Sequence, residues 1–115
     1  MQIINSSKDL KVVDIYRLTK SPNTKKMSEA KGERIELSAW ALYKDADKKT
    51  GELREILAVA DSKGNSYATN SPTFIADFVE MVNLFADAGE TVPAITVISG
   101  TSKAGREFIS CAYCE

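Results

Sequence analysis

Apolar and polar residues alternate over two long runs in the first half of the chain. Every second residue from Ile35 to Tyr43 is apolar, and a second run extends from Leu53 to Ala60 after a polar segment that contains Gly51. A period of two is typical of β-strands, and a polar segment with glycine between two such runs favours a hairpin. The pattern predicts two long strands joined as a hairpin, and one face of the first strand is apolar throughout.

The pattern changes from strand-like to helical at Ser71. A turn signal around Gly64 and the short run from Ser66 to Thr69 predict a third strand before this point. Ser71 is a favourable N-cap, and Pro72 suits the first turn of a helix. Apolar residues then recur at helical spacing until Gly89, namely Phe74, Ile75, Phe78, Met81, Val82 and Phe85. We expect one helix here, with its three phenylalanines in the core.

Two more strands are expected after the helix. Residues 94–99 are rich in Ile and Val, and a basic turn from Gly100 to Gly105 leads into residues 106–113. Three strands, one helix and two strands is the element order of the OB-fold, a five-stranded, partly open barrel with its helix between strands three and four. The sequence therefore predicts a mainly β fold of this type.

The first 32 residues differ from the rest of the chain in charge. They contain seven Lys or Arg against three acids, although the whole chain has a net charge of −1. Ser6 and Ser7 are suited to cap a short helix that runs to Thr19, and the segment from Ser21 to Gly32 has the composition of a loop. A chain of 115 residues builds one core of ordinary size. We expect a single domain over residues 1–115, with a basic N-terminal helical extension over 1–32 and a barrel over 33–115.

Composition argues for a folded protein that does not enter a membrane. Hydrophobic residues make up 43% of the chain and charged residues 27%, a balance that is usual for globular proteins. No apolar run approaches the roughly 20 residues that a membrane span requires. The sequence turns polar at Asn5, which does not fit a signal peptide. We expect a protein of the bacterial host cytoplasm.

Catalytic and metal chemistry find little support in the sequence. The chain has no histidine, no glycine-rich phosphate loop and no nucleophile elbow. Asp45 and Asp47 lie in a lysine-rich turn, which is typical of a solvated loop. Cys111 and Cys114 form a single CxxC, whereas a four-thiolate zinc site needs a second pair, so an intersubunit site is the alternative to a structural role. We expect no enzyme, no cofactor and no bound metal.

Cations and aromatic residues lie close together at several points of the predicted strands and turns. Binding of single strands requires both, because lysines contact phosphates and bases stack on aromatic rings. The candidate nucleic-acid-binding residues are Tyr43, Lys44, Lys48, Lys49, Lys63, Tyr67, Lys103 and Arg106. Unless a bulge intervenes, alternation puts Trp40 and Tyr43 on opposite faces, and we expect Tyr43 to lie outside. The alternatives are tyrosines in the core or at its rim, and a solvated hairpin tip at Lys103 and Arg106.

Four sequence stretches resemble the single-stranded DNA-binding proteins of phages that replicate linear genomes by protein priming (phi29-like phages), and of related Gram-positive prophages and mobile elements. These stretches are DIYRLTKSP (14–22), AWALYKD (39–45), YATNSPTF (67–74) and ISGTSKAGREFI (98–109). The resemblance implies an OB-fold that coats and protects displaced strands during replication, with tyrosines that stack on bases. Tyr43 and Tyr67 fall where this family places such tyrosines.

The sequence also departs from this family in two respects. The turn after Tyr43, in which phage members can carry a further tyrosine, has Lys48, Lys49 and Thr50 instead, so we expect weaker stacking and stronger phosphate contact. The sequence ends at Glu115 without a long acidic tail of the kind by which bacterial counterparts recruit partners, so recruitment through such a tail is not expected.

The function expected from residues and resemblance together is non-sequence-specific binding of single-stranded DNA, with replication proteins as a further class of partner. RNA binding uses the same stacking interactions and stays open. A protein-interaction module also stays open, because OB-folds host many functions. The oligomeric state is not determined by these patterns.

Overall fold

A computed structural model describes residues 1–7 and 10–114. Its elements, in chain order, are β1 (Gln2–Ser6), α1 (Val12–Thr19), β2 (Lys25–Lys26), the 3₁₀ helix η1 (Met27–Ala30), β3 (Arg34–Ala46), β4 (Leu53–Asp61), β5 (Ser66–Thr69), α2 (Pro72–Asp87), β6 (Ala94–Thr101) and β7 (Glu107–Tyr113). The prediction of a mainly β fold is confirmed. From β3 onward the order is three strands, a helix and two strands, as predicted.

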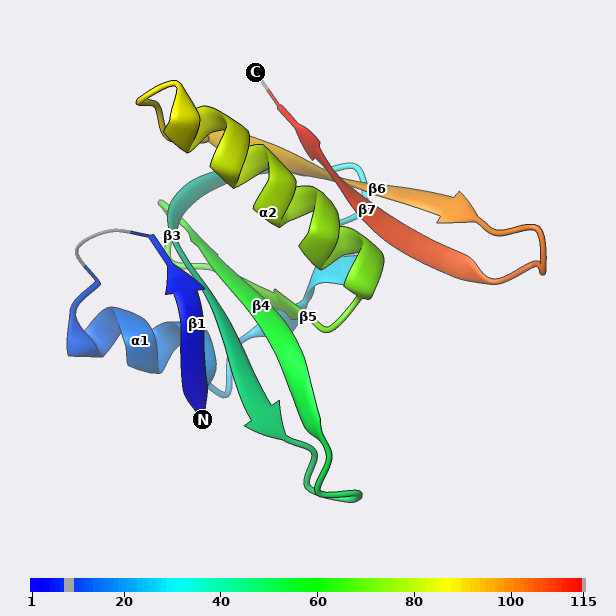
Figure 1. Cartoon of the computed structure of the whole chain (residues 1–115), viewed down its shortest axis with the longest axis horizontal. Helices are drawn as coiled ribbons and strands as arrows, with labels where there is room; N and C mark the ends of the chain where they lie inside the picture. Colours follow the sequence, from blue (N-terminus) through cyan, green and yellow to red (C-terminus); the bar gives the residue numbers. More distant parts are fainter. Residues whose placement is uncertain (8–9, 115) are drawn as a thin grey trace.

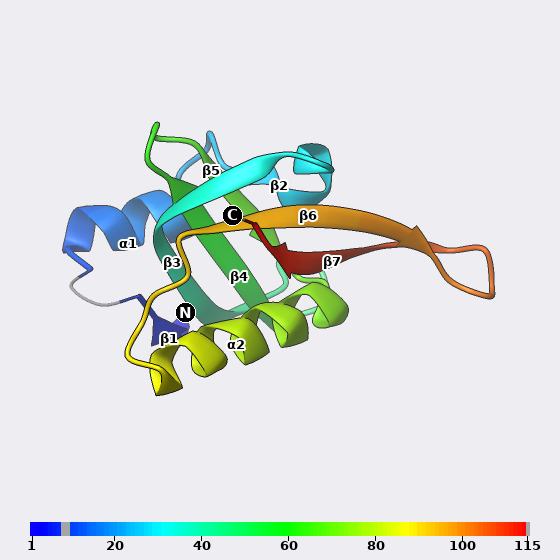
Figure 2. The same cartoon turned by 90° about the horizontal axis from the view of Figure 1, so that it is seen from above.

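The strands form one curled sheet that closes about half of a barrel (Figure 1). Its order is β2-β5-β4-β3-β6-β7, and β1 adds to β3 off this path. β3 connects the two parts of the curled sheet. Residues 34–36 pair with β6, whereas the second half of β3 lies between β1 and β4. Figure 2 shows β3 and β4 between α1 on one side and α2 on the other, while the β6–β7 hairpin projects away. Within the described residues, no helix is long and apolar enough to cross a membrane.

The faces of β3 change along its length. The pairing of β3 with β4 shifts register between Leu37 and Ala39. Before the shift, Ile35 lies in the main core; after it, Trp40 packs against this core and Ala41 belongs to a second cluster on the opposite side of the sheet. The expectation that one apolar face continues through the whole strand is therefore wrong. The β-bulge adds one residue, so the odd-numbered residues face the main core before it and the even-numbered residues face it afterwards.

α2 is the predicted helix and covers the inner face of the sheet. The Ser71 hydroxyl accepts a hydrogen bond from the Phe74 amide at 3.3 Å, and Pro72 occupies the first turn. Gly89 ends the helix with a φ of 75°, and the Glu90 amide donates to the Phe85 carbonyl at 2.8 Å, as in a Schellman motif. Phe74 and Phe78 are fully buried and Phe85 is partly buried against the core, in agreement with their predicted role.

The N-terminal quarter has more structure than its sequence predicts. The strand count of five is wrong, because β1 and β2 are additional strands. Ser7 does not cap a helix; its hydroxyl donates to the Trp40 carbonyl and accepts from the Trp40 amide, and α1 begins only at Val12. The expected loop contains β2 and η1, because Met27 and Ala30 are both fully buried and complete the main core.

Replacing Phe78 with Ala is expected to lower the free energy of unfolding by about 3 to 5 kcal/mol, because the ring is fully buried and a cavity would remain. Leu84→Ala on the same helix is the matched control. Leu84 is exposed, so we expect little change there. Urea denaturation curves of the two variants and the wild type measure the difference. Equal midpoints for all three would contradict the observed packing of α2.

Candidate nucleic-acid interface

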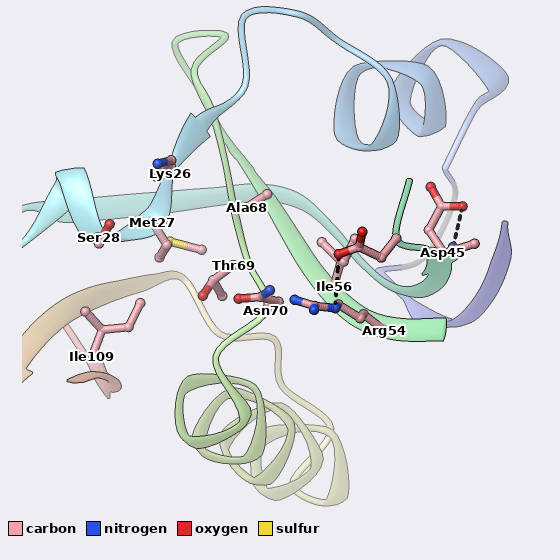
Figure 3. A pocket seen from close by; sticks show the side chains of 12 residues that line it. Lys26, Met27, Ser28, Asp45, Arg54, Ile56, Ala68, Thr69, Asn70 and Ile109 are labelled. Atoms are coloured by element: carbon pink, nitrogen blue, oxygen red, sulfur yellow. Dashed lines mark hydrogen bonds and ion pairs between the residues drawn. The ribbon is translucent and has the colours of Figure 1, made fainter. Parts of the chain in front are cut away.

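An open groove of about 510 Å³ lies beside the β3–β4 hairpin (Figure 3). One side is formed by β2 and η1, the other by the start of β4, and the end of β5 lies between them. The lining residues are Lys26, Met27, Ser28, Asp45, Ala46, Asp47, Arg54, Ile56, Ala68, Thr69, Asn70 and Ile109. The groove thus brings together segments from both halves of the chain, with cations and carboxylates at its mouth.

Of the four charged side chains that line the groove, Asp45, Asp47 and Arg54 form ion pairs, whereas Lys26 pairs with no other described side chain. The Arg54 Nε lies 3.4 Å from an Asp47 carboxylate oxygen. Asp47 also accepts backbone hydrogen bonds from Lys49 at 2.7 Å and Thr50 at 3.3 Å, and these bonds, with Arg54 nearby, lower its pKa. Asp45 lies 3.8 Å from Lys20 and 3.9 Å from the amino group of Met1. An incoming phosphate must therefore compete with these two carboxylates for the cations.

The predicted lysines of the first hairpin divide between two places. Lys48 and Lys49 are exposed in the turn between β3 and β4, next to the groove. Lys44 points to the opposite face from Tyr43 by strand alternation, and it pairs in register with Glu55, which lines a hollow beside α2. The structure therefore places Lys48 and Lys49 at the groove and Lys44 behind it.

The remaining predicted cations lie at two distant turns. Lys63 is in the β4–β5 turn, where its amide donates to Asp61, at the other end of β4 from Arg54. At roughly 3.4 Å per residue, the three residues between Ala58, which pairs with the groove residue Ala68, and the end of β4 separate this turn from the groove by about 10 Å. Lys103 and Arg106 are exposed in the β6–β7 turn, at the tip of the projecting hairpin.

Tyr43 lies on the outer face of the sheet, but it is only 5% exposed. Trp40 lies on the inner side against Phe78, so the predicted alternation of the two rings is confirmed. The expectation that Tyr43 is exposed is wrong, because the fully buried Leu18 of α1 packs over it in the second cluster. Burial, with the nearby charge of Asp45, raises the pKa of Tyr43.

Tyr67 is 7% exposed and belongs to the main core, on the other face of the sheet from Tyr43. The Lys25 ammonium of β2 lies 5.9 Å from the centre of its ring. Burial raises the pKa of Tyr67, and the charges of Asp61 and Glu33 act in the same direction. The two tyrosines therefore do not form one stacking surface in this structure, and their contact with nucleic acid stays a prediction.

Residues 10–26, which we call the N-terminal arm, cover the outer face of β3, β4 and β5. The surface beneath them consists mostly of small side chains, namely Ala39, Ala41, Ala58, Ala60 and Ala68. Leu18 is fully buried there, Thr24 hydrogen-bonds Ser66 through their hydroxyls at 3.0 Å, and Lys20 pairs with Asp45. Alanines allow a helix to approach the sheet closely, so the arm fits this face with little apolar area in contact.

None of the eight candidate nucleic-acid-binding residues lines the groove, and its two cations, Arg54 and Lys26, were not among the candidates. Arg54 stands opposite Asp45 in the register of β3 and β4, and this pairing is the signal that points to it. Lys26 lies in the segment for which the sequence predicts a loop, and it lines the groove because β2 pairs with β5.

The two cysteines are not joined in a disulfide. Cys111 is buried, and burial, with a smaller effect from Asp77, raises its pKa to about 12. Its thiol is therefore neutral at pH 7, whereas zinc binds the thiolate. Among residues 1–7 and 10–114, no three His, Cys, Asp or Glu side chains gather into a metal-binding group.

A curled half-barrel with an open groove that contains cationic side chains is typical of small β-proteins that bind oligonucleotides. Comparison with protein families leads to the same class. Residues 4–113 match the family model of the phi29-type phage single-stranded DNA-binding proteins, and the chain belongs to this family, which is a non-enzymatic DNA-binding family. Searches of curated proteins and of solved structures found no match.

Asp47→Asn is expected to strengthen binding of a dT oligonucleotide at low salt. The amide oxygen of Asn still accepts the turn hydrogen bonds, while Arg54 becomes available to a phosphate. The dependence of log K on log salt should steepen by about 0.7 for one additional phosphate contact. Because the pKa of Asp47 is lowered, acidification should reproduce this gain in the wild type only below the usual range of a carboxyl group.

Glu80→Gln is the matched control, since it removes one negative charge from the exposed surface of α2, away from this groove. Equal gains in the two variants would mean that net charge alone sets the affinity, and the proposed competition between Asp47 and a phosphate would be wrong.

Proposed function

We propose that this protein is an OB-fold that binds single-stranded DNA with little regard to sequence. Its role would be to coat and protect strands displaced while a phage or mobile-element genome replicates in a bacterial cytoplasm. Family membership supports single-stranded DNA as the ligand. The order of β3, β4, β5, α2, β6 and β7 supports the fold, because it is the order of OB-fold elements.

The groove is the observation that carries the proposal. OB-folds bind oligonucleotides on the face of their second and third strands, between the loops that join strands one and two and strands four and five. Here β4, β5 and the β3–β4 and β6–β7 hairpins hold these positions, and the groove contains residues from each of them. Lys26 and Arg54 line it, the exposed lysines of the β3–β4 turn lie next to it, and the cations of the β6–β7 turn lie farther out along the hairpin. A DNA strand that follows this groove needs no side chains that recognise particular bases. Phosphate contacts and stacking, which do not depend on sequence, are therefore the expected interactions.

Stacking on Tyr43 requires the N-terminal arm to move. Tyr43 pairs in register with Ile56, which lines the groove, so the covered ring is next to the proposed DNA path. Burial of Leu18 stabilises the arm by about 1.5 to 3 kcal/mol. The exposed Lys20–Asp45 pair adds about 0 to 1 kcal/mol. Each stacked base contributes about 1 to 3 kcal/mol, so DNA binding and arm binding are of similar strength.

We therefore include Tyr43 and Tyr67 in the proposed site, on the condition that the arm is released. For Tyr67 the release uncovers less, because its ring belongs to the main core on the opposite face; the arm contributes only β2, which pairs beside β5, and the Lys25 ammonium, 5.9 Å from the ring centre. Release of residues 10–26 would expose the alanine face and extend the groove across β3, β4 and β5.

Titration of intrinsic fluorescence with poly-dT tests the function. We expect strong quenching by the single strand, weaker binding as salt rises, and little response to a duplex of the same length. Affinity for a matched RNA oligonucleotide tests the preference for DNA. A flat titration with poly-dT at low salt would contradict the proposed function.

The same titration with Tyr43→Phe and Tyr67→Phe tests the two tyrosines. Phenylalanine keeps the aromatic ring but does not emit as tyrosine does. If the replaced tyrosine stacks on a base, the variant should bind with nearly the wild-type affinity and lose less tyrosine emission on binding than the wild type does. If both variants show the wild-type quenching of tyrosine emission, the arm stays closed and neither ring contacts DNA.

Replacing Lys103 and Arg106 together with Ala is expected to weaken binding and to reduce the salt dependence of log K by about 1.4, the value for two phosphate contacts on a single strand. Lys63→Ala is the control, because Lys63 lies at the far end of β4. We expect Lys63→Ala to leave affinity and salt dependence nearly unchanged. An unchanged salt dependence in the double variant would exclude the β6–β7 turn from the site.

A further inference from the structure

The outer face of the β6–β7 hairpin carries an exposed aromatic ring that sequence patterns did not single out. Phe108 is 40% exposed and Ile98 is 46% exposed. Both side chains point away from the main core, since Val97 and Ile109, their neighbours in sequence, are buried in it. The hairpin projects from the rest of the molecule in both views, so this face is open to solvent (Figures 1 and 2).

Gly100 holds the Phe108 ring in place. The two residues are directly opposite in the pairing of β6 and β7. A Cβ at Gly100 would lie 2.6 Å from Cζ of Phe108 and 3.1 Å from each Cε, so the ring lies across the glycine where any side chain would clash. The end of the ring therefore lies close to the Gly100 backbone, while the rest of the ring is open to solvent.

Two cations lie in the turn that precedes this ring in the chain. Arg106 directly precedes β7 and is two residues before Phe108, and its carbonyl accepts a hydrogen bond from the Ser102 amide at 2.8 Å across the turn. Lys103 is in the same turn, and neither residue forms an ion pair with another described side chain. Consecutive nucleotides present a flat base and a charged phosphate in alternation, so a ring with free cations next to it is complementary to them. A second copy of this chain would bring the same positive charges and is disfavoured.

The position of β7 allows one strand of DNA to reach both faces of the hairpin. β7 is the last strand in the sheet order, and Ile109 lines the groove on its inner side. Phe108, the preceding residue, faces outward. A strand that leaves the groove at Ile109 needs only to pass over the free edge of β7 to reach Phe108.

We propose that Phe108, Arg106 and Lys103 form a second nucleotide subsite, in which one base stacks on the Phe108 ring and the adjacent phosphates contact the two cations. This inference rests on the proposed binding of single-stranded DNA. It adds a path that wraps around the edge of β7 and a stacking residue that is accessible without movement of the N-terminal arm.

Binding of dT oligonucleotides to Phe108→Leu tests the subsite. Leucine keeps an apolar side chain over Gly100 but offers no ring, so we expect affinity for an oligonucleotide of about 16 nucleotides to fall about tenfold. Salt dependence should stay unchanged because no charge is lost. For an oligonucleotide of about four nucleotides, which fills the groove alone, the loss should be small. Phe108→Trp should bind like the wild type, and its added emission, relative to that of Trp40, should be quenched by the long oligonucleotide.

Ile98→Ala is the control, since it trims the same face without removing a ring, and we expect less than about a twofold change. If the wild type binds but Phe108→Leu binds equally well, the subsite is wrong and the proposed function stands. If the wild type does not bind, both are wrong. Equal losses in Phe108→Leu and Phe108→Trp, or a dimer by sedimentation that dissociates in Phe108→Leu, would assign the ring to packing or to self-association and overturn the subsite.

Discussion

The bulge in β3 is the constraint on which the rest of the structure depends. Without the shift between Leu37 and Ala39, strand alternation would direct Ala41 toward α2 and Trp40 away from it. With the shift, large side chains meet the phenylalanines of α2 and small ones face outward. The outer face of the sheet is thereby made smooth enough to receive the N-terminal arm, and Tyr43 is placed beneath it.

Electrostatic attraction for DNA in this protein is local. The chain as a whole has a net charge of −1 and gives no long-range attraction for a polyanion. Cations that form no ion pair with another described side chain occur at the tips of the two hairpins, whereas the arginine inside the groove pairs with Asp47. A phosphate that contacts a cation at a hairpin tip gains a new ion pair, whereas a phosphate that contacts Arg54 in the groove must replace the ion pair between Arg54 and Asp47. The affinity should therefore depend more on the hairpin tips than on the groove floor.

Aromatic rings in the proposed site differ in what separates them from solvent. Tyr43 is covered by a helix, Tyr67 by a lysine and a two-residue strand, and Phe108 only on the side that faces Gly100. A single strand of DNA can stack on the last of these at once, whereas Tyr43 requires the release of residues 10–26 and Tyr67 is also packed in the main core.

Local patterns in the sequence determined the elements whose signals lie within a few residues of one another. The positions of β3 and β4 in the chain, the Ser71 cap, the Gly89 stop and the glycine turns depend on neighbouring backbone groups, and each was predicted, although the bulge in β3 interrupts its period. Hairpin tips follow from the same signals, which is why Lys48, Lys49, Lys103 and Arg106 could be placed at exposed turns. Only the tertiary structure decided which face of β3 is buried, that Met27 completes the core, and that Leu18 covers Tyr43. These outcomes depend on contacts between residues far apart in the chain, so a local repeat of apolar and polar residues does not predict them.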